Sequence, residues 1–255
     1  MNDEALEPGD DALLRPPPRV GVDPRWYVAI HVVVVSLVLA GLAWLCQRGS
    51  LDMALARLFV DASGHNFAWR DSALLDILGH QAARGLPFLV GAVAVAGGVA
   101  GFAVRSLRPW TPILLTTGAA MLLGPLAVNM LKTMTTPHCP IALQAFGGVV
   151  DYAAEQRGPF WATSPQSAGH CSPSGHAGGG YGLLSLYFAG WAAGRPAWRW
   201  RGLAIGIAAG LVFSVVRMMQ GAHFASATLW SATIDWTVCA VLFMPLLCRA
   251  TTRAD

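Results

Sequence analysis

The sequence predicts an all-α protein, a bundle of six membrane-spanning helices with short interfacial helices in its outer loops. The first observation is composition, because the 255 residues are 55% hydrophobic and only 12% charged, whereas about 25% of a typical soluble domain is charged. The second is six apolar runs that reach or approach the roughly 20 residues that a helix needs to cross a bilayer. They are about Trp26 to Cys46, Leu86 to Val104, Thr111 to Leu131, Ala177 to Gly194, Leu203 to Met219 and Thr228 to Leu247.

The segment before the first apolar run is polar and rich in proline. It contains several acidic residues and the sequence RPPPR, which is unlike a cleaved signal peptide. We therefore expect the first span to remain as an anchor. The sequence predicts three parts: a disordered cytoplasmic leader over residues 1–24, a six-helix membrane domain over residues 25–248, and a cytoplasmic tail over residues 249–255.

Basic residues indicate the orientation of the spans. Ten of the 17 Lys and Arg residues fall in short segments on one side of the predicted bundle: Arg15, Arg19, Arg25, Arg105, Arg108, Arg195, Arg199, Arg201, Arg249 and Arg253. The positive-inside rule assigns that side to the cytoplasm. Both termini are thus expected inside, and the net charge of +3 does not indicate nucleic-acid binding.

Two long segments are expected on the outer side. Residues Gly49 to Gly85 have leucines at helical spacing with charges between them, a pattern typical of helices that lie in the membrane surface. Such helices would either pack as a simple cover or gate access of a substrate, and both interpretations remain open. Residues Thr133 to Pro173 are rich in Pro, Gly and aromatic residues without periodicity, which predicts an ordered loop.

Three polar clusters stand at the outer ends of apolar runs, where polar residues are costly and therefore informative. Lys132 ends the third run, SPSGHAGGG precedes the fourth from Ser172 onward, and RMMQGAHF joins the fifth to the sixth with Arg217 and His223. All three clusters are expected on the same face of the membrane.

These residue types suit a phosphate group. Lys132 and Arg217 supply positive charge, and the planar guanidinium matches phosphate oxygens. The Ser-Gly-His turn offers a hydroxyl and backbone N–H groups at a helix start, which favours an anion, and glycine permits close approach. His176 and His223 are able to divide the nucleophile and acid roles. Each residue alone has a structural explanation, such as a snorkelling lysine or glycines for helix packing, but their joint placement favours a site.

The clusters resemble the signature of the type 2 phosphatidic acid phosphatases, integral membrane lipid phosphatases with six helices. That signature is Lys, six residues, Arg-Pro; then Pro-Ser-Gly-His; then Ser-Arg, five residues, His, three residues, Asp. The matching residues at matching spacing are Lys132, Pro140, Pro173, Ser174, Gly175, His176, Arg217 and His223. The resemblance covers about residues 86–247.

The resemblance implies a mechanism and a setting. His223 would attack phosphorus to give a phosphohistidine, and His176 would protonate the leaving lipid oxygen. The phosphoryl group would be held by Lys132, Ser174, Gly175 and Arg217. No metal or cofactor is called for, and the expected partner is a lipid phosphate in the bilayer, with no obligate protein partner. The expected location is a bacterial inner membrane, with the site on the periplasmic face.

Two departures from the family pattern matter. Cys139 replaces the Arg of the first motif, as in a bacterial subgroup that carries Cys-Pro there, and Ala227 replaces the Asp that orients the nucleophilic histidine. The loss of that carboxylate predicts low activity, and a gain of about ten-fold or more in Ala227→Asp. Cys139 and Ala227 together favour the alternative function, a weakened or silent relative that binds phospholipid headgroups. A transporter is disfavoured, because the charged groups gather at one surface instead of mid-membrane.

The cysteines divide into two groups. Cys46, Cys239 and Cys248 lie in apolar runs and are expected to be small core residues. Cys139 and Cys171 lie in the outer loop beside the phosphate-site motifs, in a compartment that permits disulfides. We predict a disulfide between Cys139 and Cys171. Two free thiols and a metal site are the alternatives, and zinc is the weakest because the spacing is not of the usual kind.

Overall fold

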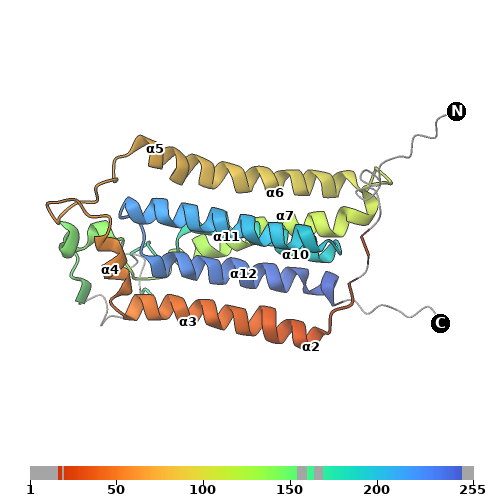
Figure 1. The fold of residues 1–255 in the computed structure, drawn as a ribbon, viewed down its shortest axis with the longest axis horizontal. Helices are drawn as coiled ribbons and strands as arrows, with labels where there is room; N and C mark the ends of the chain where they lie inside the picture. The colour runs from red at the N-terminus through yellow and green to blue at the C-terminus, as the bar shows by residue number, and fades with distance from the viewer. Residues whose placement is uncertain (1–16, 19, 154–159, 164–168, 249–255) are drawn as a thin grey trace.

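The computed structural model describes residues 17–18, 20–153, 160–163 and 169–248, and Figure 1 shows them as a bundle of roughly parallel helices. In chain order its helical elements are α2 (Pro24–Tyr27), η1 (Val28–Val34), α3 (Val35–Arg48), α4 (Leu51–Arg57), α5 (Ala73–Asp76), η2 (Ile77–Ala82), α6 (Ala83–Ala100), η3 (Arg108–Trp110), α7 (Thr111–Lys132), η4 (Pro140–Ala142), η5 (Gln144–Phe146), α9 (Gly175–Tyr181), η7 (Gly182–Leu184), α10 (Ser185–Ala192), α11 (Pro196–Met219) and α12 (Ala225–Leu247). Among the described residues there is no β-strand, so the all-α prediction is confirmed. Most of the predicted leader and all of the predicted tail lie outside the described residues.

Four helices are long and apolar enough to cross a membrane: Pro24–Arg48, Arg108–Lys132, Pro196–Met219 and Ala225–Leu247. They correspond to the first, third, fifth and sixth predicted spans. The second predicted span contains a shorter apolar helix, Gly85–Ala100, and the fourth is divided into α9, η7 and α10. Counted by length and apolar composition alone, the described residues therefore contain four spans instead of six.

The N-terminal span is fixed to the bundle at its start. Pro24 occupies the first turn, and the Asp23 side chain accepts a hydrogen bond of 2.8 Å from Trp26 N, an arrangement that favours helix initiation. The Tyr27 hydroxyl then donates to the carbonyl of Ala240 at 2.8 Å. Because Ala240 lies on α12, this bond joins α2 to α12.

The first outer segment differs in part from its prediction. α4 is a short helix at the end of the bundle, close to α3 (Figure 1), as expected for an interfacial helix. Leu74 and Leu75, however, belong to α5, which continues through η2 into α6. Their helical spacing therefore belongs to the start of the helix of the second predicted span, and not to a separate surface helix.

The glycines of the fourth apolar run permit close helix packing. A Cβ added at Gly180 would lie 2.7 Å from the Phe213 ring, and one added at Gly210 would overlap the Tyr181 ring. α9 and α11 therefore approach each other at distances that only glycine allows. For Gly180, the structure therefore supports the explanation that glycine permits close helix packing.

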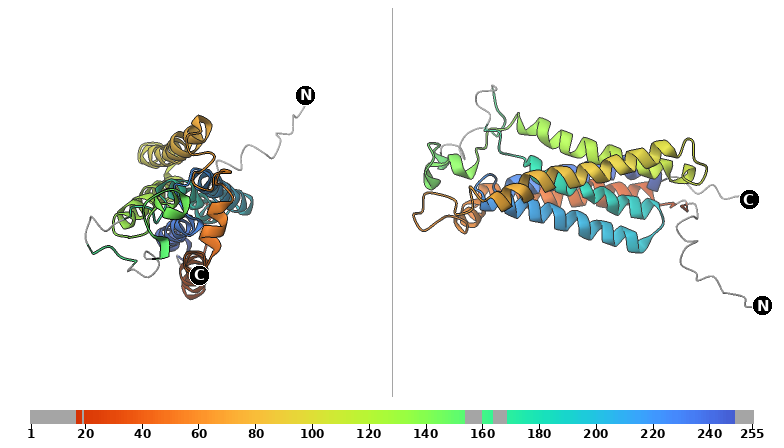
Figure 2. Two further views of the ribbon diagram at one scale, coloured as in Figure 1. Left: turned by 90° about the vertical axis from the view of Figure 1, so that its left-hand side faces the viewer. Right: turned by 90° about the horizontal axis from the view of Figure 1, so that it is seen from above.

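The predicted polar clusters lie at one end of the bundle and the basic connections at the other. The α6–α7 and α10–α11 connections lie at the end where α2 begins, opposite α4 (Figure 1). Val22 N donates to Leu247 O at 2.9 Å, which places the end of α12 there as well. Viewed along the bundle in Figure 2, α4 and the outer loops cover the opposite end, to which Lys132, Gly175 and His223 belong.

Candidate active site

Three segments form the candidate site: the end of α7, the start of α9 and the turn between α11 and α12. The rings of His176 and His223 are 6.5 Å apart between centroids, with an interplanar angle of 50°. Lys132 lies in the last turn of α7 and Arg217 in the last turn of α11. Both basic residues lower the pKa of His223 through their charge, so all four side chains share one electrostatic environment.

His223 is buried, with 3% of its surface exposed. The preceding turn contains Gly221 at φ +68°, and a Cβ there would overlap the Phe67 ring, so this turn requires glycine. His223 Nδ1 lies 2.9 Å from the main-chain oxygen of Cys171. Because a carbonyl oxygen only accepts, Nδ1 carries the hydrogen and donates it, which leaves Nε2 as the basic nitrogen.

Burial lowers the pKa of His223 from 6.5 to about 3. The hydrogen bond to Cys171 acts in the opposite direction, and the charges of Lys132 and Arg217 lower the pKa further. The imidazole is therefore neutral at neutral pH, with a lone pair on Nε2. A neutral ring in this state is suited to act as a nucleophile.

The segment from Cys171 to Ser174 is attached on both sides. Cys171 forms a disulfide with Cys139, with their Cα atoms 5.1 Å apart. Thr135 Oγ1 donates to the main-chain oxygen of Ser172. On the other side, Ser174 N donates to Ala227 O at 3.0 Å. The segment thus connects the loop after α7 to the first turn of α12.

Ser174 is the N-cap of α9. Its hydroxyl oxygen accepts a hydrogen bond of 3.4 Å from Ala177 N, and its side chain is fully buried. Capping of this kind stabilises a helix by about 1 kcal/mol. Gly175, the next residue, faces Asn129, whose Oδ1 would lie 2.8 Å from an added Cβ. Both motif residues therefore shape the start of α9, and His176 follows them directly.

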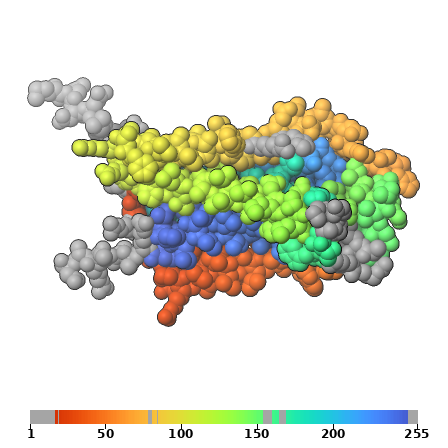
Figure 3. All heavy atoms as spheres, turned by 180° about the vertical axis from the view of Figure 1, so that it is seen from behind, coloured from red at the N-terminus to blue at the C-terminus, as the bar shows by residue number. Residues whose placement is uncertain are grey.

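A groove begins at these residues and continues along the bundle. It has a volume of about 430 Å³ and is lined by Ala83, Pro87, Phe88, Met121, Leu122, Pro125, Leu126, Asn129, Lys132, Gly175, His176 and Gly179. Its walls come from α6, α7 and α9. In Figure 3, α9 is visible in teal between α6 in yellow and α7 in yellow-green. Polar residues stand at one end of the groove and apolar residues form the rest.

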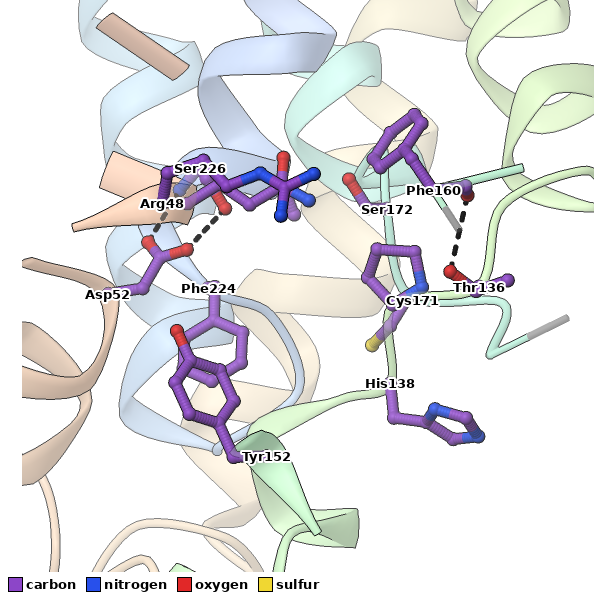
Figure 4. Close-up of a pocket in the computed structure, with 13 residues that line it drawn as sticks. Arg48, Asp52, Thr136, His138, Tyr152, Phe160, Cys171, Ser172, Phe224 and Ser226 are labelled. Atoms are coloured by element: carbon purple, nitrogen blue, oxygen red, sulfur yellow. Dashed lines mark hydrogen bonds between the residues drawn. The ribbon is translucent and has the colours of Figure 1, made fainter. Parts of the chain in front are cut away.

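Ala227 lies beside the Cys171–Ser174 segment, because its carbonyl accepts the hydrogen bond from Ser174 N. It is buried, and it lines a cavity of about 30 Å³ together with Cys171 and Ser172 (Figure 4). This volume suits about two water molecules. At the opposite wall in Figure 4, Asp52 accepts hydrogen bonds from Ser226 N at 2.9 Å and Ser226 Oγ at 2.5 Å. A carboxylate from α4 thus caps the start of α12, directly after His223.

Three groups near the site were not predicted from the sequence. Asp52 is one, and its signal was an isolated acid in the otherwise apolar start of α4. Gln220 accepts a hydrogen bond of 2.8 Å from Arg217 Nη1, and its position three residues after Arg217 was the available signal. The third is the carbonyl of Cys171, for which no residue type gives a signal.

The fold and the apolar helices define an integral membrane protein, and the polar cluster at one end is of the kind that binds phosphate. The family model of the PAP2 superfamily matches residues 113–246, more than half of the chain. The protein therefore belongs to the PAP2 superfamily, whose members are phosphatases. It is accordingly a membrane phosphatase of the phosphoric ester hydrolase class. Neither a curated protein nor a solved structure matches the chain.

Proposed function

We propose that the protein is a lipid phosphatase or phosphotransferase that cleaves a phosphomonoester or diphosphate of a lipid at the outer leaflet. The observation that carries the proposal is the groove that ends at Lys132 and His176. Leu122 lines the same groove ten residues before Lys132, which is about 15 Å along α7. An apolar chain of that length fits beside α7 while its phosphate group lies at the polar end.

The proposed reaction has two displacements at phosphorus. His223 Nε2 forms a bond to phosphorus while the bond from phosphorus to the lipid oxygen breaks, and His176 gives its proton to that oxygen. His176 then takes a proton from water, whose oxygen bonds to phosphorus as the N–P bond breaks. An alcohol in place of water would make the same reaction a phosphotransfer.

Charge stabilisation in this mechanism comes from Lys132 and Arg217. Both would face the phosphoryl oxygens, and the guanidinium is already oriented by its 2.8 Å hydrogen bond to Gln220. Ser174 and Gly175 would hold the phosphoryl group through the start of α9. The buried position of the Ser174 hydroxyl makes its capping role the larger contribution.

The proposed topology has six spans, with α5 to α6 as the second and α9 to α10 as the fourth. Their support is that both run alongside the four longer helices in Figure 1. The basic connections would then be cytoplasmic, and the site would be on the periplasmic face of a bacterial inner membrane. The proposed domain spans residues 25–248, between the leader and the tail.

A second candidate function, a silent relative that binds headgroups, is favoured by the two departures from the family pattern, Cys139 and Ala227. The Asp of the family is expected to accept a hydrogen bond from the nucleophilic histidine. In this protein, Cys171 O already accepts that bond from Nδ1 of His223. The missing carboxylate at position 227 therefore counts less toward the silent relative, and we favour the phosphatase.

The test compares two adjacent leucines of α7. Leu122 lines the groove and is 66% exposed, whereas Leu123 lines a different apolar surface and is 41% exposed. Leu122→Trp is expected to raise KM for a long-chain lipid phosphate several-fold by filling the groove. It should leave KM for a water-soluble phosphate monoester unchanged.

Leu123→Trp is the matched control, because it adds the same ring one residue away and outside the groove. It should leave both KM values near those of the parent. Equal effects of the two variants on the long-chain lipid, or no activity of the parent on any lipid phosphate, would argue against the proposed substrate class.

A further inference from the structure

We propose that the main-chain carbonyl of Cys171, held in place by the Cys139–Cys171 disulfide, is the group that positions His223 for catalysis. It would replace the carboxylate that the family carries at position 227. The inference rests on the proposed function, in which His223 is the nucleophile. It adds a requirement that the family signature lacks, namely that activity depends on an intact disulfide.

The contact itself is short and protected from water. Cys171 O and His223 Nδ1 are 2.9 Å apart, and the two residues are 2% and 3% exposed. A hydrogen bond to a buried imidazole selects its tautomer and fixes the ring plane. With Nδ1 donating, Nε2 is the nitrogen with the lone pair.

Position 227 has no group that does the same. The Ala227 side chain is a methyl group, and the Ala227 carbonyl accepts hydrogen bonds from Ser174 N and Ser231 Oγ, each at 3.0 Å. Asp52, the nearby carboxylate, is engaged by both Ser226 N and Ser226 Oγ. Within the described part of the chain, Nδ1 lies 2.9 Å from Cys171 O and 3.6 Å from the disulfide sulfur of Cys171, and the carbonyl oxygen is the closer and stronger acceptor.

The disulfide fixes the peptide that carries this carbonyl. Cys139 lies in the loop after α7, and the next residues are joined to the turn before His223, because Ile141 N donates to Gly221 O at 3.1 Å. Cys171 is thereby linked through Cys139 to the same turn that holds His223. The Cys171 N donates to Pro137 O at 3.3 Å, so both partners of the contact are attached to a single loop.

Charges around His223 suit a neutral acceptor. The groups that act on the ring are Lys132, Arg217 and His176, and each lowers the pKa of His223. A carboxylate on Nδ1 would attract the two permanent cations toward itself. A carbonyl orients the ring and leaves Lys132 and Arg217 for the negative phosphoryl group.

Reduction is therefore expected to lower turnover. A dithiol such as dithiothreitol supplies two electrons and two protons, which convert the disulfide to two thiols while the reagent closes to its own cyclic disulfide. The Cys171 peptide then loses one attachment. Displacement of a catalytic group by about 1 Å costs roughly 10²-fold in rate, so kcat should fall while KM, set by the groove, stays within about two-fold.

The experiment uses the full chain in detergent or vesicles with a lipid phosphate. Cys139→Ser breaks the disulfide and keeps the Cys171 peptide, and Cys139→Ser/Cys171→Ser removes the remaining thiol. Cys248→Ser is the matched control, since Cys248 follows α12 at the far end of the bundle. Both disulfide variants should lose roughly 10- to 100-fold in kcat, and Cys248→Ser should not change it.

A rescue separates positioning from simple structural support. Ala227→Asp, added to Cys139→Ser, supplies a carboxylate from a residue that lines the same cavity as Cys171, and it should restore kcat at least five-fold, as an order-of-magnitude expectation from triad carboxylates. The same substitution in the oxidised parent should give no such gain. Ala227→Asn is the uncharged control and should rescue less.

Two outcomes would overturn the inference. One is a Cys139→Ser variant with parental kcat, and the other is a folded Cys139→Ser variant whose lost activity Ala227→Asp does not restore. If the variant does not fold, the tautomer of His223 in the oxidised parent is measured instead, from the NMR chemical shifts of its imidazole nitrogens. A hydrogen on Nδ1 supports the inference, and a hydrogen on Nε2 refutes it. Inactivity of the parent on every lipid phosphate would instead refute the proposed function, and the nitrogen shifts would still test the hydrogen bond.

Discussion

His223→Gln is expected to abolish the acid-labile phosphoenzyme and to reduce turnover by about 10⁴-fold or more, because removal of a nucleophile leaves only the binding groups to act. Glutamine keeps the volume of the imidazole and can still donate to Cys171 O, which lies 2.9 Å from Nδ1 of His223. The measurement is acid-quenched labelling with a lipid phosphate radiolabelled at phosphorus.

His65→Gln is the control, because His65 is an exposed histidine in the loop after α4 and outside the site. It should form the phosphoenzyme at the parental level. Labelling that persists in His223→Gln would transfer the nucleophile role to another residue, and His176 is the first to consider because its ring lies 6.5 Å from that of His223.

His176→Gln is expected to lower turnover of lipid phosphomonoesters by about 10²- to 10⁴-fold, the usual contribution of a general acid. The loss should shrink for substrates whose leaving group needs no proton, such as a lipid diphosphate or an aryl phosphate. His176 lines the groove, which brings it next to the oxygen that departs.

The diagnostic result is the slope of rate against leaving-group pKa. It should be steeper in His176→Gln than in the parent, and the phosphoenzyme should still form with aryl phosphates. An equal loss for all leaving groups would assign His176 to binding or structure instead of proton transfer.

The helices that the sequence predicted best are those defined by apolar content alone. The spans that end at Arg48, Lys132, Met219 and Leu247 have long apolar runs, and run length predicts such helices directly. The fourth run contains several glycines and is divided by η7 into α9 and α10. At Gly180 this segment packs closely against α11, and one segment of sequence does not report the shape of its neighbour.

For the site, the motifs predicted the side chains at the ends of α7, α9 and α11, whose roles stay predictions until tested. The structure brings His176 and His223 together. What the sequence could not predict are contacts between distant segments and contacts made by main-chain atoms. Asp52 reaches Ser226 across 174 residues, and Cys171 acts through its carbonyl, which every residue type possesses.

Ala227 shows how such a contact changes a prediction. From the motif alone, the missing carboxylate predicted low activity and a gain in Ala227→Asp. Because Cys171 O accepts the hydrogen bond from His223 Nδ1, the gain is now expected only when the disulfide is broken. The prediction depended on a side chain, whereas the protein uses a peptide group.

The most direct test of the central claim is phosphate release by the purified, oxidised protein in vesicles that contain one lipid phosphate at a time. A panel of polyprenyl diphosphate, phosphatidylglycerol phosphate, phosphatidic acid and a lipid A phosphate covers the substrates considered. The account predicts that at least one lipid yields one inorganic phosphate per molecule cleaved, and that His223→Gln releases none. Binding or transbilayer movement of these lipids without phosphate release, by a protein that retains its disulfide, would contradict it.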